Sequence, residues 1–174
     1  KPVRIELDID AGFTGSKTEY NVIGEITGRS KPDEVVVIGG HLDSWDLGTG
    51  AVDDGAGVAI TMAAGSLIGK LKKAPKRTVR VVAYANEEQG LLGGKAYAEA
   101  LQAEVENHQL GAESDFGAGR IYALQAGVDE ASWQVLEQIG AVLKPLGIPV
   151  DKTNGGPGPA GENPRIVGRA RARR

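Results

Sequence analysis

The sequence predicts an α/β protein with the architecture of a three-layer α/β/α sandwich. Short apolar runs of strand length alternate along the chain with longer stretches of helical character, the pattern of a sheet covered by helices on both faces. Val35–Ile38 is apolar at every position, as expected of a strand buried on both faces, and Val79–Ala85 is nearly so. With 174 residues, 41% of them hydrophobic, the chain is long enough to form one packed domain.

Three strands are predicted in the first part of the chain. Val3–Ile9 alternates apolar and polar side chains, which indicates a half-buried strand near a sheet edge. Tyr20–Thr27 is the second strand, and the polar turn after it contains Pro32, which is not expected inside a strand. The short turn favours an antiparallel hairpin between Tyr20–Thr27 and Val35–Ile38. The later predicted strands are Val79–Ala85, Leu110–Ser114 and Ile121–Gln125.

Three helices are predicted between and after these strands. The first runs from Asp53 to about residue 71, and its apolar side chains lie around much of its circumference, so we expect it to be largely buried. The third covers Asp129–Leu143, with Asp129 as its candidate N-cap. The second covers Gly90–Glu104, with inward positions expected at Leu91, Leu92, Tyr97 and Leu101.

Composition narrows the classes of function. The chain has no cysteine, which excludes disulfides and thiolate metal sites, and no apolar stretch approaches the ~18 residues of a membrane span. The net charge is −3, but residues 165–174 hold five arginines and no acid, so residues 1–164, with 15 basic and 23 acidic residues, carry −8. An acidic body disfavours a nucleic-acid partner, even with a basic tail.

Polar side chains follow the predicted strands at their C-terminal ends, where ligands bind in open α/β sheets. A Gly-rich loop and the start of the first helix add further carboxylates. One imidazole with several carboxylates is a ligand set for hard or borderline divalent metals. The side chains concerned are His41, Asp43, Asp53, Glu87, Glu88 and Asp115.

Four motifs in this order resemble those of the dizinc exopeptidases, with the carboxypeptidase Q-like dipeptidases and aminopeptidases as the closest branch. The resemblance extends over roughly residues 20–149 and implies a mixed, mainly parallel sheet. It also implies a peptide or dipeptide substrate and a secreted or periplasmic location, although no signal peptide is visible. The motifs are GGHLDSWD at 39–46, GAVDDGAG at 50–57, NEEQG at 86–90 and ESD at 113–115.

The resemblance implies two Zn²⁺ ions with His41, Asp53, Glu88 and Asp115 as ligands. Asp53 would bridge the two ions, and its peptide bond to Asp54 would be cis. The site formed by His41, Asp53 and Asp115 is complete, whereas the site with Asp53 and Glu88 lacks a histidine.

The resemblance also implies two catalytic roles beside the metals. Glu87 would be the general base for a metal-bound hydroxide that attacks the scissile carbonyl. Asp43 lies two positions after His41, so strand alternation places the two side chains on the same side. Its carboxylate would accept the second ring N–H of His41 and fix the tautomer. The other histidine, His108, is expected to be structural or exposed.

Composition changes at residue 155. Residues 1–154 are predicted to form the zinc-exopeptidase-like catalytic domain, incomplete at its C-terminal end, and the Gly/Pro/Arg-rich residues 155–174 are predicted to be disordered. The sequence departs from the resembled family at about Pro159, and a shifted reading frame is our hypothesis for that departure.

The sequence leaves two other functions open. A non-catalytic truncated relative would keep the fold and bind one metal or none, which the missing histidine favours and Glu87 disfavours. Nucleic-acid binding through the arginine tail is disfavoured because the body is acidic and no motif supports it. No membrane partner is expected, and a homodimer is one assembly that the sequence leaves open.

Overall fold

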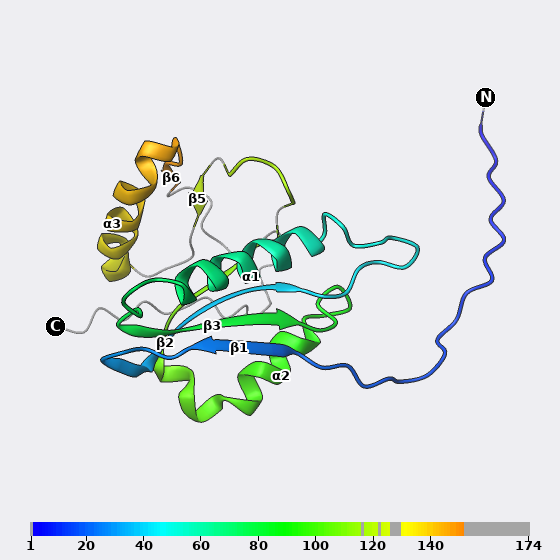
Figure 1. Ribbon diagram of the computed structural model, residues 1–174. Helices are drawn as coiled ribbons and strands as arrows, with labels where there is room; N and C mark the ends of the chain where they lie inside the picture. The colour runs from blue at the N-terminus through cyan, green and yellow to red at the C-terminus, as the bar shows by residue number, and fades with distance from the viewer. Residues whose placement is uncertain (1, 116, 122, 126–129, 152–174) are drawn as a thin grey trace.

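The computed structural model describes residues 2–115, 117–121, 123–125 and 130–151, and a four-stranded sheet forms its centre (Figure 1). The strand order is β1-β3-β2-β4. β2 is parallel to both β3 and β4, and β1 is antiparallel to β3. The sheet is therefore mixed and mainly parallel, as predicted. Its strands are β1 (Val22–Ile26), β2 (Lys31–His41), β3 (Arg77–Tyr84) and β4 (His108–Glu113).

Helices cover both faces of this sheet, which confirms the three-layer sandwich. α1 (Gly55–Gly69) lies on one face and α2 (Leu92–Ala100) on the other (Figure 1). Side chains of β3 alternate between the two layers. Val81 faces α1, because a Cβ added at Gly65 of that helix would touch its side chain. Tyr84 faces the other layer and packs edge-on against Tyr97 of α2.

The core lies mainly between the sheet and α2. Val37 and Val82 are at most 1% exposed and pack with Val35, Tyr84 and Tyr97. Their burial agrees with the prediction that Val35–Ile38 and Val79–Ala85 are central strands. The core therefore fixes the parallel strands β2 and β3, whose C-terminal ends carry the candidate site.

Within the sheet unit, η1 (Gln102–Asn107) connects α2 to β4. A second, small unit follows β4, and in it β5 (Leu124–Gln125) pairs in parallel with β6 (Val150–Asp151). The predicted strand at 121–125 is thus shorter than expected, and Ile121 is 60% exposed. Asp129, the candidate N-cap, lies outside the described residues. The helical elements of this unit are η2 (Glu130–Ser132), α3 (Trp133–Leu143) and η3 (Lys144–Leu146).

Two strand predictions were wrong. Val3–Ile9 forms no strand: its four apolar side chains are at least 75% exposed, and Figure 1 shows this part of the chain extending away from the sheet. The predicted hairpin is also absent, because β3 lies between β1 and β2 in the sheet. Pro32 falls inside β2, at a register irregularity between Lys31 and Val35 where the loss of an N–H is tolerated.

Two burial predictions were wrong as well. α1 buries only a narrow stripe of small side chains, formed by Gly57, Thr61 and Gly65, and leaves much of its apolar outer face exposed. Leu92, expected to face inward, is 49% exposed.

The predicted disordered tail, residues 155–174, lies outside the described residues. No helix among the described residues is long and apolar enough to cross a membrane.

Candidate metal centre

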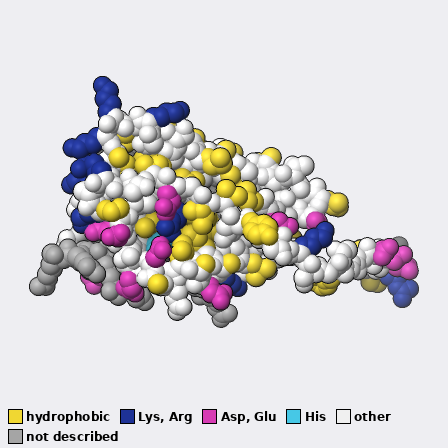
Figure 2. Space-filling view, turned by 60° about the horizontal axis from the view of Figure 1, so that its bottom comes forward, with side chains coloured by type: hydrophobic (Ala, Val, Ile, Leu, Met, Phe, Trp, Pro, Cys, Tyr) yellow, Lys and Arg dark blue, Asp and Glu magenta, His cyan; other side chains and the backbone are white. Residues whose placement is uncertain are grey.

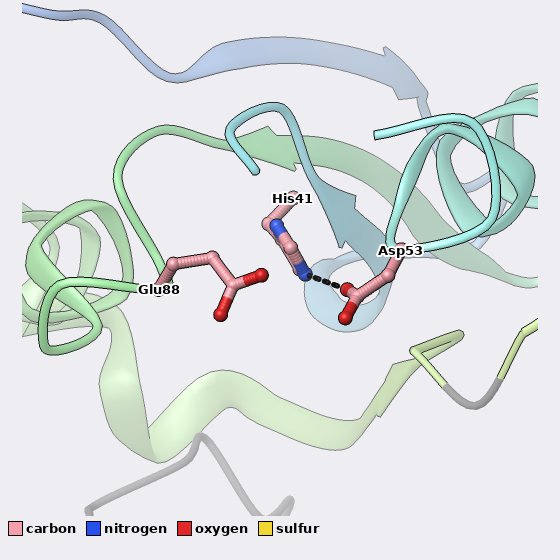
Figure 3. Close-up of side chains that lie close together, drawn as sticks. All are labelled: His41, Asp53 and Glu88. Carbon is pink, nitrogen blue, oxygen red and sulfur yellow. Dashed lines mark hydrogen bonds and ion pairs between the residues drawn. The ribbon is translucent and has the colours of Figure 1, made fainter. Parts of the chain in front are cut away.

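The sheet topology brings the candidate residues to one edge. β2 lies between β3 and β4 and runs parallel to both, so the three C-terminal ends are neighbours. β2 ends at His41, the loop after β3 carries Glu87 and Glu88, and the loop after β4 carries Asp115. Asp53 reaches the same place from the residues before α1 (Figure 3).

His41 is the centre of the cluster and is 1% exposed. Its Nδ1 lies 3.0 Å from the backbone carbonyl oxygen of Asp43. Because a carbonyl oxygen can only accept, Nδ1 carries a hydrogen. Nε2 is therefore the ring nitrogen that faces the other ligands, 3.1 Å from Oδ1 of Asp53 and 3.2 Å from Oδ1 of Asp115.

The electrostatics around His41 are those of a cation site. Burial opposes a charge on the ring, but the carboxylates of Asp115, Glu87 and Asp54 more than offset this and raise the pKa of His41 to about 9. Nε2 faces two carboxylate oxygens, neither of which donates when ionised, so a proton on Nε2 bridges them. A metal ion would replace this proton.

The distances also fit zinc. Ligand atoms about 2.0–2.1 Å from a tetrahedral zinc ion lie about 3.3–3.4 Å apart. The separations of 3.1 and 3.2 Å between Nε2 of His41 and its two carboxylate partners are close to that spacing. An imidazole nitrogen with carboxylate oxygens is an ordinary zinc donor set. The described residues therefore fit the predicted metal in both chemistry and geometry.

Two groups of residues could each hold an ion, and both include His41. In the first, ligand atoms of His41, Asp53 and Glu88 all lie within 4.8 Å of one another; Figure 3 shows these three side chains pointing toward one another. In the second, the same holds for His41, Asp54 and Asp115. The three carboxylates among the predicted ligands thus meet around the imidazole of the fourth, His41. The peptide bond between Asp53 and Asp54 is cis, as the resemblance implied.

Asp54 is the residue of this cluster that the sequence analysis did not single out. It is 1% exposed, and its carboxylate accepts the backbone N–H of His41 at 2.9 Å and that of Gly57 at 3.1 Å. It therefore caps α1 and ties the end of β2 to that helix. Burial raises the pKa of Asp54, although its two N–H donors oppose the rise. An acidic helix start was visible in the sequence; the bond to His41 was not.

Asp43 is placed differently from the prediction. The ring N–H of His41 is directed to the backbone carbonyl of Asp43, and the carboxylate oxygen Oδ1 is farther away, 3.5 Å from Nδ1. The carboxylate instead accepts two backbone N–H groups, from Glu87 at 2.7 Å and from Glu88 at 3.0 Å. Asp43 therefore joins the loop after β2 to the loop after β3 and fixes the backbone that presents both glutamates.

The two glutamates stand beside the imidazole. Glu88 belongs to the group with His41 and Asp53, and its partial burial and the neighbouring Asp53 carboxylate raise its pKa. Glu87 is close enough for its charge to raise the pKa of His41. Asn86, just before them, has a φ of 51°, so the chain turns sharply as β3 ends.

His108 is not part of this cluster, as predicted. It is 7% exposed at the start of β4, where Nδ1 donates to the carbonyl of Glu104 at 3.0 Å. Nε2 therefore accepts from the hydroxyl of Tyr97 at 2.9 Å, and that hydroxyl in turn accepts from Arg80 at 2.7 Å. This chain of bonds joins β3, α2 and β4 and gives His108 a structural role.

Comparison with known proteins agrees with the geometry. The model of peptidase family M28 matches residues 21–157. The chain belongs to peptidase family M28. This confirms the predicted resemblance. Carboxypeptidase Q from Homo sapiens is 40% identical over 144 residues, which cover 83% of this chain and 30% of carboxypeptidase Q. The chain thus spans less than a third of the length of this carboxypeptidase Q.

Solved structures show the same fold. A peptidase M28 precursor from Shewanella amazonensis SB2B has a TM-score of 0.73 and 53% identity, over 79% of this chain and 31% of that one. BSAP, a zinc aminopeptidase from Bacillus subtilis, has a TM-score of 0.62 over 75% of this chain and 34% of its own, at 19% identity. At that identity the second likeness concerns the fold alone, and it supports the observed mixed sheet with helices on both faces.

Proposed function

We propose that this chain carries the metal centre of a zinc-dependent exopeptidase, an aminopeptidase or a dipeptidase that hydrolyses peptide bonds near a chain terminus. The observation that carries the proposal is the position of Nε2 of His41, 3.1 Å from Asp53 and 3.2 Å from Asp115 with Glu87 and Glu88 beside it. Membership of family M28 and the names of the relatives with 40% and 53% identity support peptide substrates.

Four side chains would hold the metal: His41, Asp53, Glu88 and Asp115. Nε2 of His41 is available because Nδ1 donates to the carbonyl of Asp43, which fixes the ring orientation. Zinc, when bound, would act as a Lewis acid that lowers the pKa of water and polarises the scissile carbonyl. Asp53 is 62% exposed on its side chain and could contact two ions, in agreement with the bridging role that the resemblance implies.

Glu87 would be the general base of the reaction. Its carboxylate lies near His41, and its backbone is held by the carboxylate of Asp43 at 2.7 Å. A carboxylate in this position can take a proton from water and pass it to the leaving amine. Asp43 would act on the reaction through the backbone of Glu87 and Glu88, which makes it a positioning residue.

A second candidate function is a relative that binds a single metal ion with little or no turnover. The observation that favours it is that both potential metal groups among the described residues share one imidazole, that of His41. Because Nδ1 of His41 is already bonded to a carbonyl, this ring can serve one ion only. The two candidates predict different zinc stoichiometries and different activities.

Replacing Glu87 by glutamine tests the proposed base. The exchange keeps the shape of the side chain but removes its capacity to accept a proton, so we expect a loss of 10²–10⁴-fold in turnover with zinc binding unchanged. The assay measures hydrolysis of amino-acid anilides and dipeptides, with zinc and after chelation. The matched control is Glu99→Gln on the exposed surface of α2, which should be fully active.

The outcomes separate the hypotheses. Full activity of Glu87→Gln would rule Glu87 out as the base. A wild-type chain that binds zinc without hydrolysing any of these substrates would favour the non-catalytic candidate. Loss of zinc binding in Glu87→Gln would instead place Glu87 among the metal ligands.

A further inference from the structure

A second feature of the surface lies at the opposite end of the strands from the metal centre. The loop between α1 and β3 combines exposed leucine and lysine side chains, and it precedes the N-terminal end of β3. The metal centre follows the C-terminal end of that strand, roughly 25 Å away for eight residues of strand. We name this surface the Leu–Lys patch, and it consists of Leu67, Lys70, Leu71, Lys72, Lys73 and Lys76.

The apolar part of the patch lies at the end of α1. Leu67 is 68% exposed and Leu71 is 58% exposed. They are four positions apart, and the chain continues in a helical turn there, with the backbone N–H of Leu71 bonded to the carbonyl of Ile68. Leu71 follows the C-cap residue Lys70, so it lies just past the end of α1. Both leucines therefore present their side chains to solvent at this end of the helix.

The basic part consists of four lysines that precede and follow Leu71 in the chain. Lys70, Lys72, Lys73 and Lys76 are all exposed. Neighbouring cations are already neutralised in part, because Lys31 and Arg77 both bond to Glu34. Within the part of the chain that the structure describes, the four lysines of the patch form no ion pair. Figure 2 shows dark-blue side chains gathered at the left of the molecule, the end at which β3 begins in Figure 1.

The patch is held in place by the backbone. The N–H of Arg29 bonds to the carbonyl of Pro75 at 3.0 Å, and the N–H of Lys31 bonds to that of Lys76 at 2.9 Å. The guanidinium of Arg29 also donates to the carbonyl of Ala74 at 3.1 Å. These bonds fix the loop against the start of β2, so its lysines project from a supported surface.

We propose that the Leu–Lys patch docks the protein on an anionic phospholipid surface. Lysine side chains attract anionic headgroups, and their aliphatic stems allow neighbouring apolar side chains to enter the interface. Exposed leucines among lysines are the feature that favours lipid over nucleic acid or a sulfated polysaccharide, because those polyanions offer no apolar layer to receive them. Docking of this kind needs no membrane-spanning helix. The expectation of no membrane partner was based on the absence of a long apolar stretch, so it does not oppose this kind of docking.

The placement of the patch has a consequence for the metal centre. Because the two lie at opposite ends of β3, docking leaves the C-terminal edge of the sheet directed away from the lipid. Peptides in solution would still reach the candidate site. The proposal therefore stands or fails independently of catalysis.

Vesicle binding of the full chain tests the proposal. Co-sedimentation is measured with phosphatidylcholine vesicles, with and without phosphatidylglycerol, at low and at physiological ionic strength. We expect binding only to the anionic vesicles, weakening as salt rises. Each lysine near such a surface contributes about fivefold in partitioning, so the double change Lys72→Glu and Lys73→Glu should weaken binding by about 30-fold or more.

Two matched controls separate the patch from general effects. Lys95→Glu makes the same kind of charge change on α2, on the other face of the sheet, and should weaken binding much less. Leu71→Ser should weaken binding about fivefold even though no charge changes, because the aliphatic contact is lost. Leu146→Ser, at 61% exposure in η3, should have no such effect.

Several results would overturn the proposal. Equal binding to neutral and anionic vesicles would exclude the electrostatic part, and equal effects of Lys95→Glu and the double lysine change would exclude the location. Binding that is insensitive to Leu71→Ser, together with tight binding to heparin or DNA, would identify a polyanion as the partner instead. Dimerisation abolished by Leu71→Ser, without vesicle binding, would assign the patch to contact between two copies.

Discussion

Gly57 is the position where the metal centre is most sensitive to an added methyl group. It lies in the first turn of α1, whose N-cap is Asp54. Real Cβ atoms essentially never come closer than 3.0 Å to a non-bonded neighbouring atom. A Cβ at Gly57 would lie more than 1 Å closer than that to the backbone oxygen of Ser114. Ser114 immediately precedes Asp115, so Gly57→Ala must push apart α1 and the loop that carries a proposed metal ligand.

Two other glycines of the same helix provide matched controls. At Gly65 a Cβ would lie 2.6 Å from Cγ2 of Val81, so this stiff, β-branched side chain must shift to admit it, at a cost that offsets the helix-forming gain of alanine. At Gly69 the nearest atom would be 3.7 Å away, an ordinary contact. Alanine gains up to about 1 kcal/mol over glycine in a helix, whereas overpacking costs about 1–3 kcal/mol. We therefore expect Gly69→Ala to stabilise slightly, Gly65→Ala to be nearly neutral, and Gly57→Ala to destabilise by about 2 kcal/mol.

Urea unfolding of the three variants, with zinc chelated, measures these differences as shifts of the midpoint at constant slope. Calorimetric titration with zinc then follows the metal centre, and only Gly57→Ala should bind zinc more weakly. If Gly57→Ala unfolds at the same urea concentration as Gly69→Ala, the close approach of α1 to Ser114 is absent in solution and the reasoning fails. Normal zinc affinity in a destabilised Gly57→Ala would show that Asp115 does not depend on this contact.

Two further predictions concern Asp43 and the first residues of the chain. Asp43→Asn replaces one of the two acceptors of the Glu87 and Glu88 N–H groups by a donor, so it should cost about 1.5–3 kcal/mol of stability and reduce turnover. Asp46→Asn, on the same exposed loop, should do neither, and equal urea midpoints of the two variants would contradict the role of Asp43 in holding the Glu87 and Glu88 backbone. Removing residues 1–9 should leave the thermal midpoint nearly unchanged, because these apolar side chains are exposed, whereas a large drop would indicate the half-buried strand that the alternation predicted.

The convergence of the candidate metal ligands could be predicted because it depends on features that are local in sequence. Apolar runs identify the central strands, and residues that follow parallel strands must meet at one edge of the sheet. This alone places His41, Glu88 and Asp115 together. The four motifs add the roles, and the donor atoms around Nε2 of His41 agree with them in distance.

The contacts that hold the site could not be predicted, because they join backbone atoms far apart in the chain. Asp54 accepts from His41, 13 residues away, and Asp43 accepts from Glu87, 44 residues away. No residue pattern marks a carboxylate for a distant backbone N–H. The hairpin prediction failed for a related reason, since a short turn indicates local pairing whereas β3 enters between β1 and β2 from later in the chain.

The burial of α1 was overestimated because its composition was taken as evidence of contact on all sides. The stripe that packs on the sheet is made of Gly57, Thr61 and Gly65, which permits a close approach of the helix to β3. The larger apolar side chains, such as Met62 and Leu67, are more than half exposed. The large apolar side chains on which the burial prediction was based are therefore not the residues that this helix buries.

Zinc stoichiometry tests how many ions this arrangement can hold. His41 can bind one ion through Nε2, because Nδ1 already donates to the carbonyl of Asp43. Each zinc ion is expected to have about three protein ligands, of which an imidazole is usually one. His108, the second histidine of the chain, is bonded to Tyr97 and Glu104 and is not available. We therefore expect one tight zinc site and a second that is much weaker.

Calorimetric titration of the metal-free chain with zinc measures both sites. His41→Ala should abolish the tight site, since it removes the imidazole and leaves only carboxylates, whereas Asp46→Asn should leave the isotherm unchanged. Zinc should also raise the urea midpoint of the wild-type chain, because a ligand that binds the folded state stabilises it in proportion to the logarithm of its concentration. Two tight sites of similar affinity would require a ligand outside the groups around His41, and the single-imidazole argument would then be wrong.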